Sequence, residues 1–401
     1  MPSCPSPLPY HRAIVEHLRA TEPALWNWFA SSRQRAAEAD AVRLELLKST
    51  YRLDAASQTK LHEQAESVRE RMQLVCRITL YQSQSGSDLN ASVAYLPSEA
   101  HIIFSGPLTS VLSETEARAV LAHELAHFML FDQWEGEYLV AADLLRALAV
   151  DPSAGNAAAE SARLFSLWTE IYADRWACHV SEDPTVAIAA LLKTSTGLAE
   201  VNPESYLRQV EEIFAKSIEK TDNFSHPEPY IRARALRLWS EKGDEAEAEI
   251  DRMIGGGLSL QRLDLLGQKR AADFTRRFLQ ALLAPVWFRS EAVMAHASRF
   301  FEDFATGTEP VNDAVLKDAL DNGDDSLRDY VCYLMLDFVS VDRELGDPAV
   351  SAALVLARRL GIQARFAELV QKELGIGKKD FARIDRDAES LLAKTDSAHS
   401  S

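Results

Sequence analysis

The 401-residue chain contains little cysteine, and its four cysteines lie far apart in the sequence. Cys4, Cys76, Cys178 and Cys332 form no CxxC pair, which argues against a disulfide framework and against a zinc site made of cysteines. Scattered thiols of this kind are typical of a reducing compartment. We therefore expect a cytoplasmic protein.

The sequence also lacks a long apolar segment. No stretch approaches the roughly 18 uninterrupted apolar residues that cross a bilayer, so no integral membrane segment is expected. Residues 1–9 are rich in proline and lack a basic start followed by an apolar core, so they do not resemble a secretory signal. Both observations agree with a cytoplasmic location.

Basic residues are too few to balance the acidic ones. There are 43 Lys and Arg against 60 Asp and Glu, which gives a formal net charge of −17. A surface this acidic repels phosphate backbones and anionic lipid, so nucleic-acid binding and membrane-surface roles are disfavoured. The apolar content of 47% and the charged content of 26% are typical of a globular protein, and the length allows two to three domains.

The hydrophobic pattern predicts helices first and then a small sheet. Apolar residues recur at helical spacing over the first fifty residues, and the helical pattern continues over 54–72. Ser113 and Glu116 form a capping box, which marks the start of the next helix. Between these helical regions, strand-like segments separated by turn-forming residues lie at 74–81, 92–96 and 101–105.

The rest of the chain has a helical pattern. A polar loop at 151–156 precedes a long helix that we expect to stop near Asp183-Pro184, and Gly255-Gly256-Gly257 is the best candidate for a linker. We therefore predict a mainly α, α+β protein with an N-terminal helical region at 1–70, a central domain at 71–254 and an all-helical C-terminal domain at 258–401. The later helices are expected at 205–219, 229–241, 270–283, 288–304, 325–340, 348–360 and 364–373.

Two histidines in the capped helix are the first candidate metal ligands. His123 and His127 are four residues apart, so both imidazoles can point at one metal ion, as in the HExxH motif of zinc peptidases. Glu124 lies about 100° further round the helix, where its carboxylate can take a proton from a metal-activated water. The alternative is a buried helix whose histidines bond to neighbouring backbone.

A second helix offers the remaining ligand. A catalytic zinc binds three protein ligands and keeps one position open. Glu170 and Asp174 lie one turn apart among apolar residues, where carboxylates are costly unless they are paired or metal-bound. Glu170 is therefore predicted as the third ligand, and Asp174 as the acceptor for the free ring N–H of a ligand histidine. A solvated acidic stripe is the alternative.

A third element could stabilise an oxyanion. His226, followed by Pro227, and Arg232 would supply the donors that a tetrahedral oxyanion needs. The alternative is an ordinary junction between a loop and a helix, with an arginine that faces water.

Together these motifs resemble a family, the HtpX-like and CaaX-prenyl-endopeptidase-like zinc metallopeptidases, which is peptidase family M48 within the gluzincins. The resemblance covers roughly residues 70–240, or a little under half of the chain. In chain order, the similar segments are Asn90-Ala91, Ile102 to Leu108, Glu116 to His127 (EARAVLAHELAH), Glu170 to Asp174, and His226-Pro227 with Arg232 and Leu236.

The resemblance implies a small sheet with an antiparallel edge, packed on a zincin-type active-site helix. It further implies one Zn²⁺ per chain and a peptide or unfolded protein as substrate, bound as an added strand along the edge strand that begins at Asn90-Ala91. Members of the family commonly carry transmembrane helices or an export signal, and this sequence shows neither. The implied roles are metal binding by His123, His127 and Glu170, general base and acid catalysis by Glu124, orientation of a ligand by Asp174, and contact with the oxyanion or substrate carbonyl by His226 and Arg232.

The C-terminal third resembles, faintly, the helical core of TerB-type tellurite-resistance domains over residues 330–360. It could recruit a protein partner. The sequence therefore predicts a zinc-dependent endopeptidase. The alternative is a non-proteolytic, zinc-containing adaptor whose helical C-terminal half binds partners, and hydrolysis of a bond other than a peptide is a third possibility.

Overall fold

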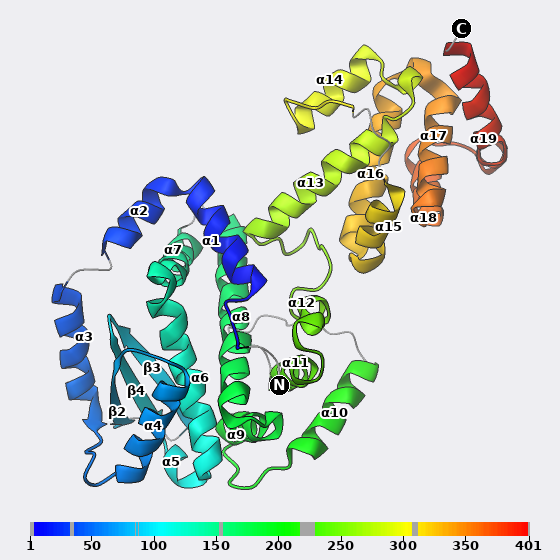
Figure 1. Cartoon of the computed structure of the whole chain (residues 1–401). Coiled ribbons are helices and arrows are strands. Elements are labelled where there is room, and N and C mark those ends of the chain that lie inside the picture. The colour runs from blue at the N-terminus through cyan, green and yellow to red at the C-terminus, as the bar shows by residue number, and fades with distance from the viewer. Residues whose placement is uncertain are drawn as a thin grey trace. The chain divides into compact units, whose positions relative to one another are not determined.

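A computed structural model describes residues 4–32, 36–84, 86, 88–151, 155–216, 229–306 and 312–399 (Figure 1). It divides into two compact units, Met1–Gly255 and Gly256–Ser401, so the division falls within the triglycine segment. The fold is mainly helical with one small sheet, which confirms the predicted α+β, mainly α class. Among the described residues, no helix is both long and apolar enough to cross a membrane.

The sheet of the first unit has four strands in the order β1-β2-β4-β3. β2 and β4 are parallel, whereas β1 pairs with β2 and β3 pairs with β4 in the antiparallel sense, so both edges are antiparallel as predicted. The sequence predicted three strands and missed β1, because a three-residue strand is too short to show alternation. The bounds are β1 (Thr50–Arg52), β2 (Arg77–Ser83), β3 (Asn90–Leu96) and β4 (Glu99–Ser105).

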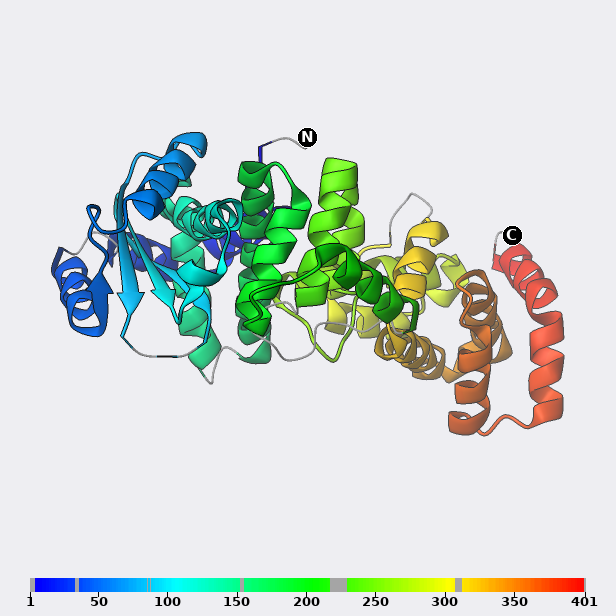
Figure 2. The same cartoon turned by 90° about the horizontal axis from the view of Figure 1, so that it is seen from below.

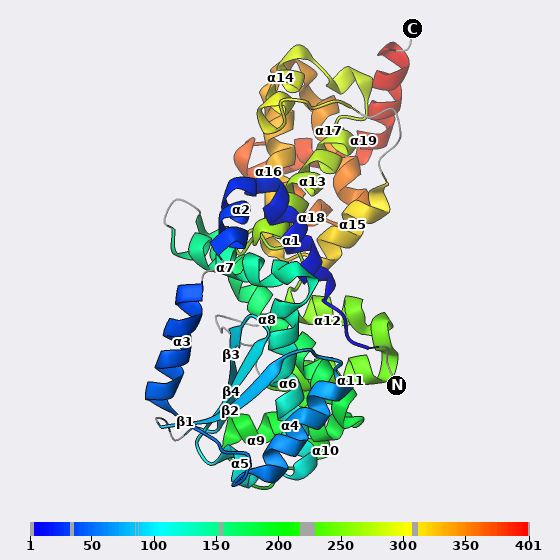
Figure 3. The ribbon, with the colours of Figure 1, turned by 60° about the vertical axis from the view of Figure 1, so that its left-hand side comes forward.

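Helices cover the sheet on both faces. Figure 3 shows the sheet between α3 (Ala36–Ser49) and α6 (Glu114–Asp132), and the salt bridge from Arg43 of α3 to Glu99 of β4, at 2.9 Å, joins α3 to the sheet. Figure 2 shows α6 beside the strands, and α6 packs against both β3 and β4. The remaining helices that precede α6 are α1 (Pro9–Thr21), α2 (Pro23–Ser32), α4 (Thr59–Arg71) and α5 (Leu108–Val111).

α6 begins at the predicted capping box. The Ser113 N–H donates to Glu116 Oε2 at 2.7 Å, and the Glu116 N–H donates to Ser113 Oγ at 3.3 Å. Glu116 also accepts a bond of 2.8 Å from Lys193 of α9 (Pro184–Thr196), which fixes α9 against the start of α6. The capping residues therefore hold two helices in place.

α6 packs along α8 (Gly155–Ser181), a long helix that ends two residues before the predicted stop. Asp183 then caps α9, since its Oδ1 accepts from the Thr185 N–H at 2.8 Å. The other helices of the first unit are α7 (Glu137–Val150), α10 (Pro203–Lys216), α11 (Pro229–Lys242) and α12 (Glu247–Ile254).

The second unit contains helices and, among its described residues, no strand. Its core is built from aromatic residues such as Phe278, Phe288, Phe338 and Phe366, all of which are fully buried. No comparison tests the resemblance to TerB-type domains, so it stays a prediction. The helices are α13 (Leu265–Leu282), α14 (Glu291–Phe300), α15 (Asp313–Asn322), α16 (Asp325–Val341), α17 (Gly346–Arg359), α18 (Gln363–Glu373) and α19 (Lys378–His399).

A buried histidine fastens α1 to the back of α8. The Leu8 N–H donates to His11 Nδ1 at 3.3 Å, so His11 carries its proton on Nε2, which lies 3.1 Å from Thr169 Oγ1. Thr169 Oγ1 in turn donates to the Phe165 carbonyl at 2.8 Å. Burial lowers the pKa of His11 to about 3, and a second ring proton would face the Leu8 N–H, so the folded protein holds His11 neutral.

This histidine should make stability depend on pH. The pKa of His11 is lower in the folded protein than in the unfolded chain. Its contribution to the free energy of unfolding is therefore complete above about pH 6.5 and is lost as the pH falls towards 3. Between pH 7.5 and 5.0, metal-free wild type should lose about 2 kcal/mol more unfolding free energy than His11→Leu. Urea unfolding of both proteins at the two pH values measures this difference. Equal pH dependence in the two proteins would contradict the assignment.

Candidate active site

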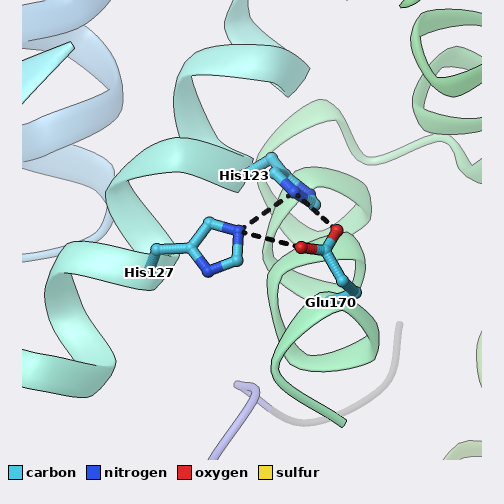
Figure 4. Close-up of side chains that lie close together, drawn as sticks. All are labelled: His123, His127 and Glu170. Carbon is cyan, nitrogen blue, oxygen red and sulfur yellow. Dashed lines mark hydrogen bonds and ion pairs between the residues drawn. The ribbon is translucent and has the colours of Figure 1, made fainter. Parts of the chain in front are cut away.

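The structure brings the three predicted metal ligands together. His123 and His127 project from α6 towards Glu170 of α8, and the three side chains face one another (Figure 4). The two Nε2 atoms are 3.2 Å apart, and the Glu170 carboxylate lies 3.4 Å from His123 Nε2 and 3.8 Å from His127 Nε2. One ligand atom from each residue lies within 4.8 Å of the others.

This set of donors fits a zinc ion. Two imidazole nitrogens and one carboxylate oxygen are ligands that zinc prefers, and three protein ligands leave a fourth position for water or substrate. Burial lowers the pKa of His127 to about 4, so its imidazole is neutral, as a metal ligand must be. Burial acts in the same direction on His123, but its bonds to Asp174 and Glu170 prevail and raise its pKa to about 10 in the metal-free protein. His123 therefore carries the positive charge that a zinc ion would supply.

Asp174 lies next to the predicted metal ligands, one turn after Glu170 on α8. Its Oδ1 is 3.1 Å from His123 Nδ1, so that ring nitrogen donates to Asp174, and Nε2 points towards Glu170 and would be the nitrogen available to a metal ion. Burial alone would favour the protonated acid. The guanidinium of Arg232 overrides burial and holds the pKa of Asp174 below its usual range.

Arg232, on α11, pairs with two carboxylates of α8, which the sequence did not show. Its Nε and Nη2 donate to the two oxygens of Asp174 at 2.7 and 2.6 Å, and its Nη1 lies 3.0 Å from Glu170 Oε2. All three guanidinium nitrogens thus face carboxylates, and the predicted contact with the oxyanion or substrate carbonyl stays a prediction. A pair of buried carboxylates one turn apart needs a cation of this kind, and the sequence contains the arginine but does not show its partners.

Replacing this arginine should destabilise the metal-free protein. Arg232→Met leaves the buried carboxylates of Asp174 and Glu170 with His123 as the cation they share, and the expected cost of losing the guanidinium is about 3–5 kcal/mol of unfolding free energy. Arg237→Met is the matched control, because Arg237 lies on the same helix in an exposed pair with Glu241 and should cost less than about 1 kcal/mol. Chemical unfolding measures both values. A similar small loss in the two variants would contradict a stabilising role for the contacts of Arg232 with Asp174 and Glu170.

Glu124 follows His123 on α6 and is 6% exposed. Burial raises its pKa to about 7. A carboxyl group that titrates near neutrality can both accept and return a proton at physiological pH. Glu124 lines the same cavity as the three predicted ligands.

That cavity has a volume of about 510 Å³ and reaches β3, which is an edge strand of the sheet formed by the described residues. Asn90, Ala91, Ser92 and Val93 of β3 all line it. Successive residues of a strand point to opposite faces, so four consecutive lining residues place the cavity along the edge of the strand rather than on one face. Asn90 and Ala91 thus lie where the sequence predicted the start of a binding edge.

One predicted site residue, His226, lies outside the described residues. Its predicted contact with the oxyanion therefore stays a prediction. α9 also lines the cavity, which was not predicted from the sequence; its lining residues are Ala187, Ala190, Leu191 and Thr194. These residues recur at helical spacing in the sequence. Small and apolar residues with that spacing are also typical of a helix face that only packs against its neighbours.

Comparison with known proteins agrees with the geometry. The profile of peptidase family M48 matches residues 55–240. Plastoglobule-localized metallopeptidase 48, chloroplastic, from Arabidopsis thaliana is 29% identical over 184 residues, which cover 40% of this chain and 51% of that protein. The chain therefore spans about half the length of this relative. No solved structure matches.

Proposed function

This chain carries a peptidase family M48 domain at residues 55–240, and on that premise we propose that it is a zinc-dependent endopeptidase. The observation that supports this most is the convergence of His123, His127 and Glu170 in a cavity that also contains the buried Glu124. Each chain would bind one Zn²⁺ through those three ligands. When bound, zinc acts as a Lewis acid that lowers the pKa of water and polarises a carbonyl.

The remaining steps belong to the side chains. Glu124 takes a proton from the attacking water and returns it to the leaving amine, which its pKa near neutrality permits. Asp174 holds the His123 ring in one tautomer, and Arg232 holds Asp174 and Glu170 in place. His226 and Arg232 remain the candidates for contact with the oxyanion.

The free edge of β3 would position the substrate. An extended peptide can add to an unpaired strand edge through main-chain hydrogen bonds, and the cavity runs along this edge. Such binding requires an extended backbone, which an unfolded protein or a flexible peptide supplies. We therefore propose peptides and unfolded proteins as substrates.

Removal of the metal tests the proposal. Incubation with a permanently unfolded protein should give internal cleavage products, a chelator should abolish cleavage, and added Zn²⁺ should restore it. Cleavage that resists complete removal of metal would contradict the proposal. Absence of cleavage by zinc-loaded protein on every unfolded substrate would favour the adaptor, although a structural zinc site prefers four protein ligands rather than three.

We also propose that the all-helical second unit recruits a protein partner. A cytoplasmic location is also a proposal, and the relative's name assigns that protein to plastoglobules of the chloroplast.

A further inference from the structure

One wall of the cavity is a single face of α9. Ala187, Ala190, Leu191 and Thr194 line it, and their spacing of three, one and three residues places them on the same side of the helix. None of the four is charged. This wall differs sharply from the part of the cavity around the predicted metal ligands, where carboxylates and imidazoles gather.

The polar groups of this wall are already engaged. Thr194 Oγ1 donates to the Ala190 and Leu191 carbonyls at 3.0 and 2.9 Å, within its own helix. Lys193 is the one charged residue in the sequence of α9, and its Nζ donates to Glu116 and to the Val111 carbonyl at 2.8 and 3.2 Å. α9 therefore offers no charged partner to a molecule in the cavity.

Neighbouring helices extend the apolar surface. Ala119 and Val120 of α6 and Ala177 of α8 also line the cavity. Val120 lies about one turn before His123, so this surface begins next to the predicted metal ligands. Arg232 also lines the cavity, but its guanidinium already faces Asp174 and Glu170, so it does not provide a site for an acidic substrate side chain.

A peptide on the edge of β3 would reach this surface. Alternate side chains of an added strand point to the same side, and β3 packs against α6, so every second side chain would point towards α6. An apolar side chain there is removed from water, whereas a charged one loses its hydration without gaining a partner. The alanine methyl groups of Ala187 and Ala190 leave room that a larger residue would fill.

We infer that the cavity contains a pocket between α6 and α9 that selects an apolar substrate side chain next to the scissile bond. Ala190 and Leu191 set its size. This inference depends on the proposed endopeptidase function, and it adds the class of side chain that the enzyme accepts. Acidic and basic side chains at this position are excluded.

Binding of short peptide hydroxamates tests the pocket without turnover. The probes share one metal-binding hydroxamate and differ in a single side chain, either that of Gly, Ala, Leu, Phe, Asp or Lys. On zinc-loaded wild-type protein, calorimetry should show the Leu and Phe probes binding about 10- to 100-fold more tightly than the Gly probe, because each buries a large apolar group. The Asp and Lys probes should bind no better than Gly.

Two variants assign this preference to α9. Ala190→Leu fills the pocket and should weaken the Phe probe by at least about 10-fold while changing the Gly probe by less than about 3-fold. Leu191→Ala enlarges the pocket and should shift the preference from Leu towards Phe. Ser195→Leu adds the same bulk to an exposed position of α9 and should leave all affinities unchanged.

The possible failures can be told apart. Equal affinity across the probes, tighter binding of Asp than of Leu, or equal weakening of every probe by Ala190→Leu overturns the pocket. Side-chain-dependent binding by a zinc-loaded protein that cleaves no peptide overturns the endopeptidase and leaves the pocket in place. If Ala190→Leu does not fold, Leu191→Ala alone decides, since an unchanged order of Leu and Phe would contradict the inference.

Discussion

Glu124→Gln is expected to keep its zinc and to lose peptide cleavage almost completely. The amide has nearly the shape of the carboxylate, so the buried position beside His123 stays filled, but the amide cannot accept a proton from water. Loss of a general base and acid lowers kcat by about 10²–10⁴, and in the proposed mechanism one residue performs both transfers, so we expect at least about 10³-fold. The measurements are kcat on an unfolded protein substrate and zinc per chain.

Glu114→Gln is the control for this substitution. Glu114 lies in the first turn of the same helix, is exposed and pairs with Lys60, so its loss should leave both turnover and zinc unchanged. Cleavage by Glu124→Gln at the wild-type rate would remove Glu124 from the mechanism. Loss of zinc from that variant would instead show that the residue holds the metal.

Glu170→Ala is expected to abolish stable zinc binding. The structure places its carboxylate within reach of both Nε2 atoms, so its removal leaves two protein ligands. Loss of a residue that only orients a ligand typically weakens metal binding by 10- to 100-fold, so loss of a ligand itself should cost at least about 100-fold. Titration of the protein against a chelator of known affinity measures this change.

Glu160→Ala is the matched control on α8. Glu160 lies near the start of the helix, almost three turns before Glu170, where it pairs with Arg163. This variant should bind zinc as wild type does. If Glu160→Ala weakens zinc binding as much as Glu170→Ala, the effect belongs to the stability of α8 and not to coordination.

The sequence predicted the parts of the site that depend on spacing within one helix. His123 and His127 share a face because they are four residues apart, and the capping box at Ser113 and Glu116 follows from backbone groups that the start of any helix leaves unpaired. Glu170 could be proposed because an apolar helix rarely carries two carboxylates without partners. These predictions depend only on spacing and capping within one helix, and the residues lie in the structure as that spacing and capping require.

Features that depend on contacts between distant segments could not be predicted in this way. The Arg232 guanidinium meets Asp174 and Glu170 only because α11 packs on α8, and nothing in the local sequence distinguishes it from a solvent-exposed arginine. The cavity wall on α9 has the same pattern as a packing face. β1 forms because β2 offers it a free edge, which no three-residue window can show.

Metal content is the most direct test of the central claim. Wild type, His127→Ala and Glu170→Ala are dialysed against a weak chelator, and zinc per chain is measured by elemental analysis alongside circular dichroism to establish that each variant is folded. The account predicts one zinc per chain in wild type and almost none in either variant. Retention of one zinc by folded Glu170→Ala, with loss only from His127→Ala, would contradict a site made of His123, His127 and Glu170.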